Sequence, residues 1–187
     1  MSSTRDQIIE TTSRLIEMHG YHATGINEII RESGAPKGSL YYYFPDGKEE
    51  LAAEAVGHAA NQIVARIESS LEAHDAPGDA VRHFIEQLAH YVEAGGYDCG
   101  GPLTTITLET ATTSERLNEA CRESYTRIQS AFETKLLESG YEKERAARLA
   151  TLINAAIEGA ITLSRTHHSP TPLYQTAEEL AALLQRG

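Results

Sequence analysis

The sequence predicts an all-α chain of about nine helices, in which a small N-terminal module precedes a larger helical part. Two observations support this prediction. Apolar residues recur at helical spacing in nearly every segment between glycine or proline breaks. Alternating runs of Val, Ile and Thr, which strands need, are almost absent. With 187 residues, 41% of them hydrophobic, the chain is long enough for both parts.

A first helix is expected over residues 4–19, and a second helix between Gly25 and Gly34. In the first helix, side chains that face the core recur every three or four residues, and Gly20 ends the helix. These side chains are Ile8, Ile9, Thr12, Leu15 and Ile16. In the second helix, three isoleucines share one face. They are Ile26, Ile29 and Ile30.

A third helix is expected to start at Pro36 and to share a small core with the second. Leu40 and Phe44 are four residues apart, so they lie on one face and point to that core. The remaining face of the third helix must then meet a partner. It carries Lys37, Ser39, Tyr41 and Tyr43. In helix-turn-helix proteins that partner is the major groove of DNA.

The run PKGSLYYYFPDGKEEL, which follows a helix ending in HGY, resembles the DNA-binding domain of TetR-type (TetR/AcrR family) transcriptional regulators. The resemblance is close over about the first 55 residues. A weaker one, around CGGPLTTITLE and INAAIEGAI, points to the multidrug-repressor subgroup. It implies a helix-turn-helix DNA-binding domain at 1–47 and a helical ligand-binding and dimerisation domain at 48–187.

The resemblance also implies which residues meet DNA. Lys37, Ser39, Tyr41 and Tyr43 match positions that touch bases or phosphates, while Tyr42 matches one that mostly packs. The full set of implied DNA-binding residues is Thr24, Asn27, Lys37, Gly38, Ser39, Tyr41, Tyr42, Tyr43 and Lys48. Within it, Thr24 and Asn27 would reach the DNA backbone, and Lys48 a phosphate. Asn27 replaces a longer basic residue and Tyr43 a histidine, so we expect these two departures to affect base specificity.

The net charge of −11 is unusual for a protein that binds nucleic acid. Residues 1–50 hold five Lys or Arg against eight Asp or Glu, a net charge of −3. Specific binding must therefore depend on where the few cations lie. We expect weak non-specific DNA binding and a strong salt dependence of specific binding.

Six further helices are expected after a turn at 45–47. They span residues 48–73, 77–93, 103–111, 115–139, 143–166 and 173–185. The glycine-rich run GGYDCGGP, which precedes the third of these, lacks the GxxxxGK[ST] pattern of a phosphate-binding loop. It is expected to be a sharp connection between helices.

The helix at 143–166 is apolar nearly all round between Leu149 and Leu163, so both of its sides must be covered. Small residues in this run would let another helix approach closely. Together with the last helix, it predicts a symmetric four-helix interface in a homodimer. The residues expected there are Leu152, Ala156, Gly159, Ala160, Leu163, Leu180 and Leu184.

Asn154 and Glu158 are four residues apart, so they share a face within this apolar run. A buried unpaired carboxylate is costly, so Glu158 must meet a neighbouring Thr or Tyr, water or a ligand. The functional alternative is an effector pocket, with a carboxylate that favours small apolar effectors carrying a cation or hydroxyl. Its expected lining is Phe84, Leu88, Tyr91, Leu103, Thr107, Ile128, Phe132, Asn154, Glu158 and Ile161.

Other classes of function find little support. Cys99 and Cys121 lack CxxC spacing, and the histidines lack HExxH spacing, so neither metal nor cofactor is expected. No catalytic constellation indicates an enzyme. We expect no membrane span and a cytoplasmic location. The leading hypothesis is a dimeric repressor that binds a near-palindromic DNA operator and is released by a small-molecule effector. The alternatives are a helix-turn-helix regulator without such an effector and, less favoured, a helical enzyme or carrier.

Overall fold

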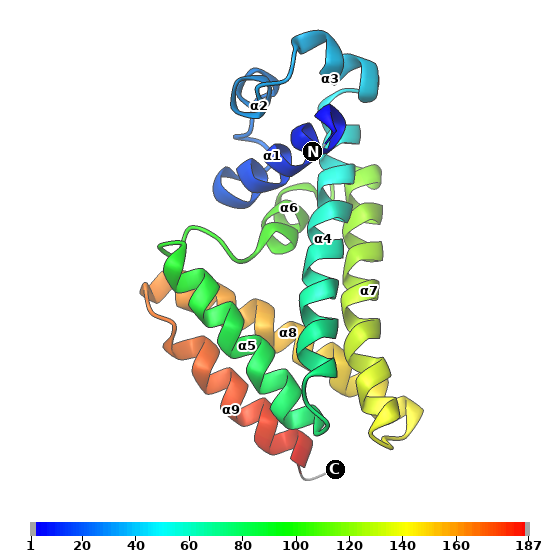
Figure 1. The fold of residues 1–187 in the computed structure, drawn as a ribbon, viewed down its shortest axis with the longest axis vertical. Coiled ribbons are helices and arrows are strands. Elements are labelled where there is room, and N and C mark those ends of the chain that lie inside the picture. Colours follow the sequence, from blue (N-terminus) through cyan, green and yellow to red (C-terminus); the bar gives the residue numbers. More distant parts are fainter. Residues whose placement is uncertain (1–2, 186–187) are drawn as a thin grey trace. The chain divides into compact units, whose positions relative to one another are not determined.

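The computed structural model describes residues 3–185, and all regular elements in that range are helices, which confirms the predicted all-α class. Figure 1 shows their arrangement. The nine helices of the described range are α1 (Thr4–His19), α2 (Ile26–Ser33), α3 (Lys37–Tyr43), α4 (Lys48–Glu72), α5 (Pro77–Ala94), α6 (Pro102–Thr110), α7 (Glu115–Glu138), α8 (Lys143–His167) and α9 (Thr171–Gln185).

The chain divides into two compact units, each built from two separate stretches of sequence. The N-terminal unit combines Met1–Asn61 with Pro102–Tyr125, and the C-terminal unit combines Gln62–Gly101 with Thr126–Gly187. Helices α4 and α7 therefore each continue from one unit into the other. Sequence analysis did not anticipate that α6 and the start of α7 pack with the N-terminal helices. A functional boundary after residue 47 stays a prediction.

The core of the N-terminal unit is formed by α1, α2, α3 and the first turns of α4. Its buried apolar members are Ile8, Ile9, Leu15, Ile29, Ala35, Leu40, Phe44, Leu51 and Ala55. Helix α1 packs against α2, α3 and α6, so it lies at the centre of this unit. Since Leu40 and Phe44 are fully buried, the predicted core face of the third helix is confirmed.

Two glycines set the turns around α2. Gly20 ends α1 with φ +85°, and Gly34 ends α2 in the left-handed conformation with φ +65°. Both values are unfavourable for residues with a Cβ, so glycine fixes the direction in which the chain leaves each helix. The N-terminus of α1 is closed by a reciprocal capping box between Ser3 and Asp6.

In the C-terminal unit, α9 packs along α5 and α8 (Figure 1). Gly78 on α5 allows a close approach, since a Cβ there would lie 2.8 Å from the carbonyl oxygen of Ala181 on α9. This packing corrects one prediction. Leu180, Leu184 and Ala160, which were expected on an uncovered stripe, are at most 5% exposed because their own chain covers them.

Helix α8 is long and apolar enough, by length and composition, to cross a membrane. It is the one such helix among the described residues, and 44% of its most apolar window is buried inside the protein. The sequence analysis expected no stretch of this kind. Core helices of soluble proteins meet the same criterion, so the observation is weak support for a membrane span.

Candidate nucleic-acid interface

Helix α3 buries one side and exposes the other. Leu40 anchors it in the core, whereas Lys37 and Gly38 in its first turn are exposed and Ser39 is half-buried. Pro36 precedes the helix as its N-cap and leaves no side-chain hydrogen bond there. The polar residues predicted to meet DNA thus lie on an accessible surface.

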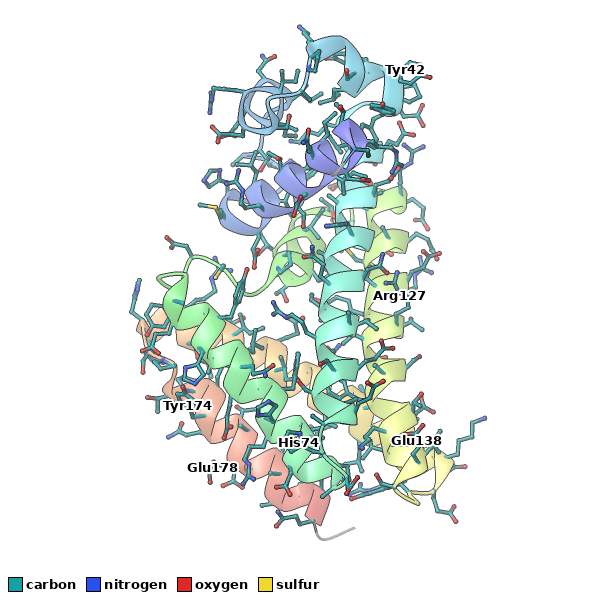
Figure 2. The ribbon with its side chains drawn as sticks, in the orientation of Figure 1. Tyr42, His74, Arg127, Glu138, Tyr174 and Glu178 are labelled. Carbon is teal, nitrogen blue, oxygen red and sulfur yellow. The ribbon has the colours of Figure 1, made fainter. Side chains whose placement is uncertain are left out.

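The three consecutive tyrosines of α3 have different surroundings. Tyr42 is 79% exposed and projects from the end of the helix (Figure 2), and Tyr41 is 47% exposed. Tyr43 instead packs against the core, with its ring edge-on to Tyr42 at a centroid distance of 5.1 Å. The expectation that Tyr42 mostly packs is therefore wrong. Helical spacing predicts that Tyr43 faces the core, because Tyr43 lies three residues after Leu40 and shares its face. We call Lys37, Gly38, Tyr41 and Tyr42 the α3 face.

The two residues expected to reach the DNA backbone differ in exposure. Asn27 is exposed in the first turn of α2. Thr24 is fully buried, and its hydroxyl donates to the carbonyl oxygen of Gly20 over 2.7 Å. The Thr24 side chain therefore closes the turn between α1 and α2, and its contact with DNA stays a prediction.

Lys48 begins α4 and is half-buried. Its Nζ lies 4.3 Å from the centre of the Tyr21 ring, in a cation–π contact. Burial lowers the pKa of Lys48, and the nearby charge of Glu109 partly opposes that shift. A DNA phosphate would have to draw Lys48 away from Tyr21 or approach both side chains together.

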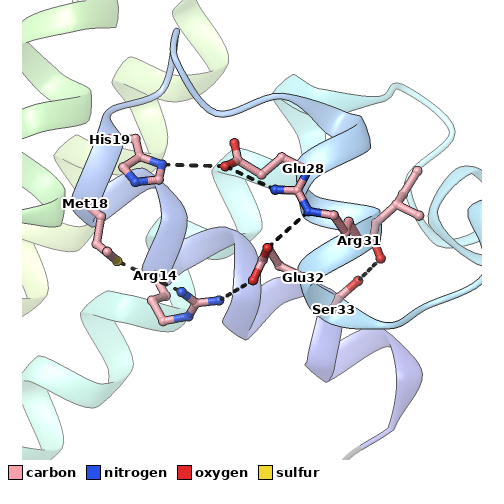
Figure 3. Close-up of polar contacts among 8 residues, drawn as sticks. Arg14, Met18, His19, Glu28, Arg31, Glu32 and Ser33 are labelled. Atoms are coloured by element: carbon pink, nitrogen blue, oxygen red, sulfur yellow. Dashed lines mark hydrogen bonds and ion pairs between the residues drawn. The ribbon is translucent and has the colours of Figure 1, made fainter.

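The acidic residues of α2 are paired with cations (Figure 3). Glu32 lies 3.2 Å from Arg31 Nε and 4.0 Å from Arg14 Nη2, and Glu28 lies 3.8 Å from Arg31 Nη2. His19 Nδ1 is 3.9 Å from Glu28. Exposed ion pairs of this kind add little stability. They do place a positive charge beside each of these two carboxylates.

Two side chains from the α6–α7 region contact the turns on either side of the α2–α3 segment. Glu109 accepts a hydrogen bond from the backbone N–H of His22 over 2.9 Å. Arg116 donates from Nη2 to Asp46 Oδ2 over 2.7 Å. We call Glu109 and Arg116 the elbow clamp. Sequence analysis missed both residues, because no local pattern indicates partners that are 70 or 87 positions away.

Comparison with known proteins decides the family. Residues 8–55 match the family described as bacterial regulatory proteins, tetR family, and residues 77–179 match the C-terminal domain of LmrA/YxaF-like transcriptional regulators. The chain belongs to the TetR family. It is 42% identical to the uncharacterized HTH-type transcriptional regulator YxaF of Bacillus subtilis, over 98% of this chain and 96% of that protein. The HTH-type transcriptional regulator LmrA of the same organism is 40% identical over 98% and 97%.

The fold agrees with this assignment. A TetR transcriptional regulator from Legionella pneumophila superimposes with a TM-score of 0.85, covers 98% of each chain and is 18% identical. This TetR-family chain is thus a DNA-binding transcriptional regulator rather than an enzyme, and its relatives belong to the multidrug-type subgroup that the resemblance indicated. Among residues 3–185, no three or more His, Cys, Asp or Glu side chains are grouped to hold a metal ion.

The residues predicted to line an effector pocket of this TetR-family protein are divided between the units. Leu103 and Thr107 lie in the N-terminal unit, and the other eight lie in the C-terminal unit. There, Phe84, Leu88 and Tyr91 line a cavity of about 190 Å³ together with Arg66 and Gln87. The structure thus brings three predicted residues together around one hollow.

The remaining predicted pocket residues of the C-terminal unit are more buried. Ile128, Phe132 and Ile161 belong to the core, and the Phe132 ring packs edge-on against Phe84 at 5.9 Å. Asn154 is buried and Glu158 is half-buried. A separate groove of about 440 Å³ between α4 and α7 contains Arg127 and Glu138 (Figure 2) and none of the predicted pocket residues.

Proposed function

We propose that this TetR-family regulator is a cytoplasmic repressor that binds a near-palindromic operator as a dimer and leaves it when a small molecule binds. The observation that carries the proposal is the α3 face, which presents a lysine and two tyrosines on a helix whose opposite side is fixed in the core. Side chains can contact base edges in a DNA groove specifically only if the helix that carries them is held rigidly.

Apolar side chains that are exposed on α8 support the proposed dimer. Leu152 and Leu163 are 47% and 51% exposed, and Gly159 has open space where a Cβ would lie. Ala156 is half-buried beside them. Exposed leucines on one helix favour an interface with a second copy, in which the two α3 faces would be one DNA turn apart, about 34–36 Å, or a multiple of that distance.

Release by an effector is supported by the hollow beside Phe84, Leu88 and Tyr91, whose lining combines these side chains with polar groups. Those polar groups are the Arg66 guanidinium, which stacks on Tyr91 at 4.9 Å, and the Gln87 amide. An apolar effector with a hydrogen-bond acceptor suits this cavity, whereas a cationic one suits Glu158 on α8.

One experiment tests the proposal. Duplexes bound by the full-length protein are selected from a random DNA pool and sequenced, and we expect an inverted repeat whose half-sites are about 10 base pairs apart or a multiple. Recovery of no specific sequence would contradict operator binding. Compounds are then screened for release of that duplex, and parallel titrations of Glu158→Gln and Arg66→Ala show which polar group binds the effector. If no compound releases the operator, the alternative of a regulator without a small-molecule effector gains support.

A further inference from the structure

The elbow clamp holds both ends of the segment that contains α2 and α3. Its first contact, from Glu109, is at His22, four residues before α2 begins. Its second contact, from Arg116, is at Asp46, three residues after α3 ends. The α2–α3 segment is therefore fixed at two turns by side chains from one region of the N-terminal unit.

The first contact, from Glu109 to the backbone N–H of His22, depends on a glycine at position 20. Gly20 carries no side chain, and a Cβ at this position would collide with the Glu109 carboxylate. The absence of a side chain there leaves room for Glu109 to reach the N–H of His22. A hydrogen bond between a backbone N–H and a carboxylate is about twice as strong as one between neutral groups.

The second contact is part of a polar network at the start of α4. Asp46 also donates its backbone N–H to Glu50 over 2.9 Å, while Ser114, in the α6–α7 turn, donates its hydroxyl to Glu49. The hydrogen bond that Arg116 donates to Asp46 and the charges of the surrounding carboxylates raise the pKa of Arg116. Cation and carboxylates together fix the turn between α3 and α4.

We infer that the elbow clamp holds α2 and α3 in the orientation that fits DNA, which makes Glu109 and Arg116 positioning residues for operator binding. Without the clamp, the α2–α3 segment would have to be ordered during binding, and that ordering would reduce affinity. The inference rests on the proposed reading of the operator by α3.

For the carboxylates in the clamp contacts, the expected change in DNA affinity is opposite to the one that charge alone predicts. Glu109 and Asp46 are anions in a module that binds a polyanion, so charge alone predicts that removing either carboxylate strengthens DNA binding. The clamp predicts weaker operator binding instead. Glu115 provides a matched control, since it lies beside Arg116 and its side chain is 92% exposed.

The first test is a double-mutant cycle with full-length protein and a duplex selected from the random pool by the wild type. Because this ion pair is exposed, we expect Asp46→Ala and Arg116→Ala each to lower operator affinity about two- to fivefold, and the double variant to be no weaker than the weaker single one. The dependence of affinity on salt should keep its slope, because no phosphate contact is lost. Glu115→Gln should bind as well as the wild type or slightly better. Additive losses, or stronger binding by Asp46→Ala, would overturn the inference.

The second test compares two variants of Glu109. Glu109→Gln keeps an oxygen that can accept from His22, so its operator affinity should stay within about twofold of the wild type, whereas Glu109→Ala should lose about five- to tenfold. Hydrogen exchange at the His22 amide should accelerate in Glu109→Ala alone, at unchanged helix content. Equal operator affinity and equal His22 amide exchange in the two variants would show that Glu109 is not a positioning residue. A wild type that selects no duplex would instead contradict the proposed function.

Discussion

At the scale of single residues, Tyr41 offers the most direct test of the α3 face. It is about half exposed and lies beyond the buried Leu40. We expect Tyr41→Ala to lower operator affinity at least about tenfold, because ring and hydroxyl contacts are both lost. Tyr41→Phe separates the two contributions. Circular dichroism should show unchanged helix content, and unaltered binding by Tyr41→Ala would remove this residue from the interface.

Lys37 and Lys48 can be distinguished by salt dependence. Lys37 is exposed, whereas Lys48 stacks on Tyr21. If each neutralises a phosphate, its replacement by Ala should reduce the slope of log affinity against log salt by about one unit. We expect this reduction for Lys37→Ala. For Lys48→Ala, an unchanged slope with weaker binding would show that Lys48 supports the turn at Tyr21 without meeting DNA.

The two cysteines should differ in reactivity. Cys121 is 2% exposed, and burial raises the pKa of its thiol, so less thiolate is present at any pH. Cys99 lies half-buried in the connection after α5. A thiol reagent at pH 8 should therefore modify Cys99 first, and Cys121 only on unfolding. Mass spectrometry of peptides sampled over time measures the order, and prior modification of Cys121 would contradict it.

At the scale of elements, two glycines in helices should respond oppositely to alanine. Gly78→Ala places a methyl group against the backbone of α9, so we expect it to lower the free energy of unfolding by about 1–3 kcal/mol. Gly57 in α4 has open space at its Cβ position. Gly57→Ala should raise the free energy of unfolding by about 0.5–1 kcal/mol through helix propensity. Chemical denaturation measures both values, and a loss for Gly57→Ala would show that α4 needs glycine there.

The helices themselves could be predicted from the sequence with small errors. The predicted bounds of α1 are those observed, because a glycine stop and a clear apolar stripe coincide. Helix α6 begins and ends one residue earlier than predicted. Within it, the Thr110 hydroxyl donates to the carbonyl oxygen of Ile106 one turn back, and the Thr104 hydroxyl pairs with that of Tyr125 on α7. Local periodicity specifies a helix well and its tertiary partners poorly.

At the scale of the whole molecule, dimerisation should depend on the exposed leucines of α8. We expect the double substitution Leu152→Ser and Leu163→Ser to weaken self-association at least about tenfold, because both side chains would lose apolar burial. Sedimentation at micromolar concentration measures it. Leu183→Ser, which changes a less exposed leucine of α9, is the matched control. A monomeric wild type would contradict the proposed interface.

The parts of the candidate site that sequence could not predict are the long-range ones. The motif around Lys37 indicates the family. Of the outward face predicted for α3, Lys37 and Tyr41 are exposed as expected, whereas Tyr43 packs against the core and Tyr42 is exposed in its place. The elbow clamp depends on how α6 and α7 return to the N-terminal helices, which no local pattern encodes. The covering of Leu180 and Leu184 depends in the same way on the packing of α9 against α5 and α8. Contacts between segments that are far apart in the sequence depend on how all the helices pack together, so they cannot be predicted from a local pattern.

The discontinuous make-up of the N-terminal unit has a consequence for engineering. Its second stretch, Pro102–Tyr125, lies far from α3 in sequence, and α4 and α7 pass into the other unit without a linker. A chimera that grafts only residues 1–61 onto a foreign sensor would leave Asp46 and the N–H of His22 without their side-chain partners. A transplant with the native contacts must carry both stretches, with splice points inside two helices. Recombination at a single crossover would not exchange this module intact.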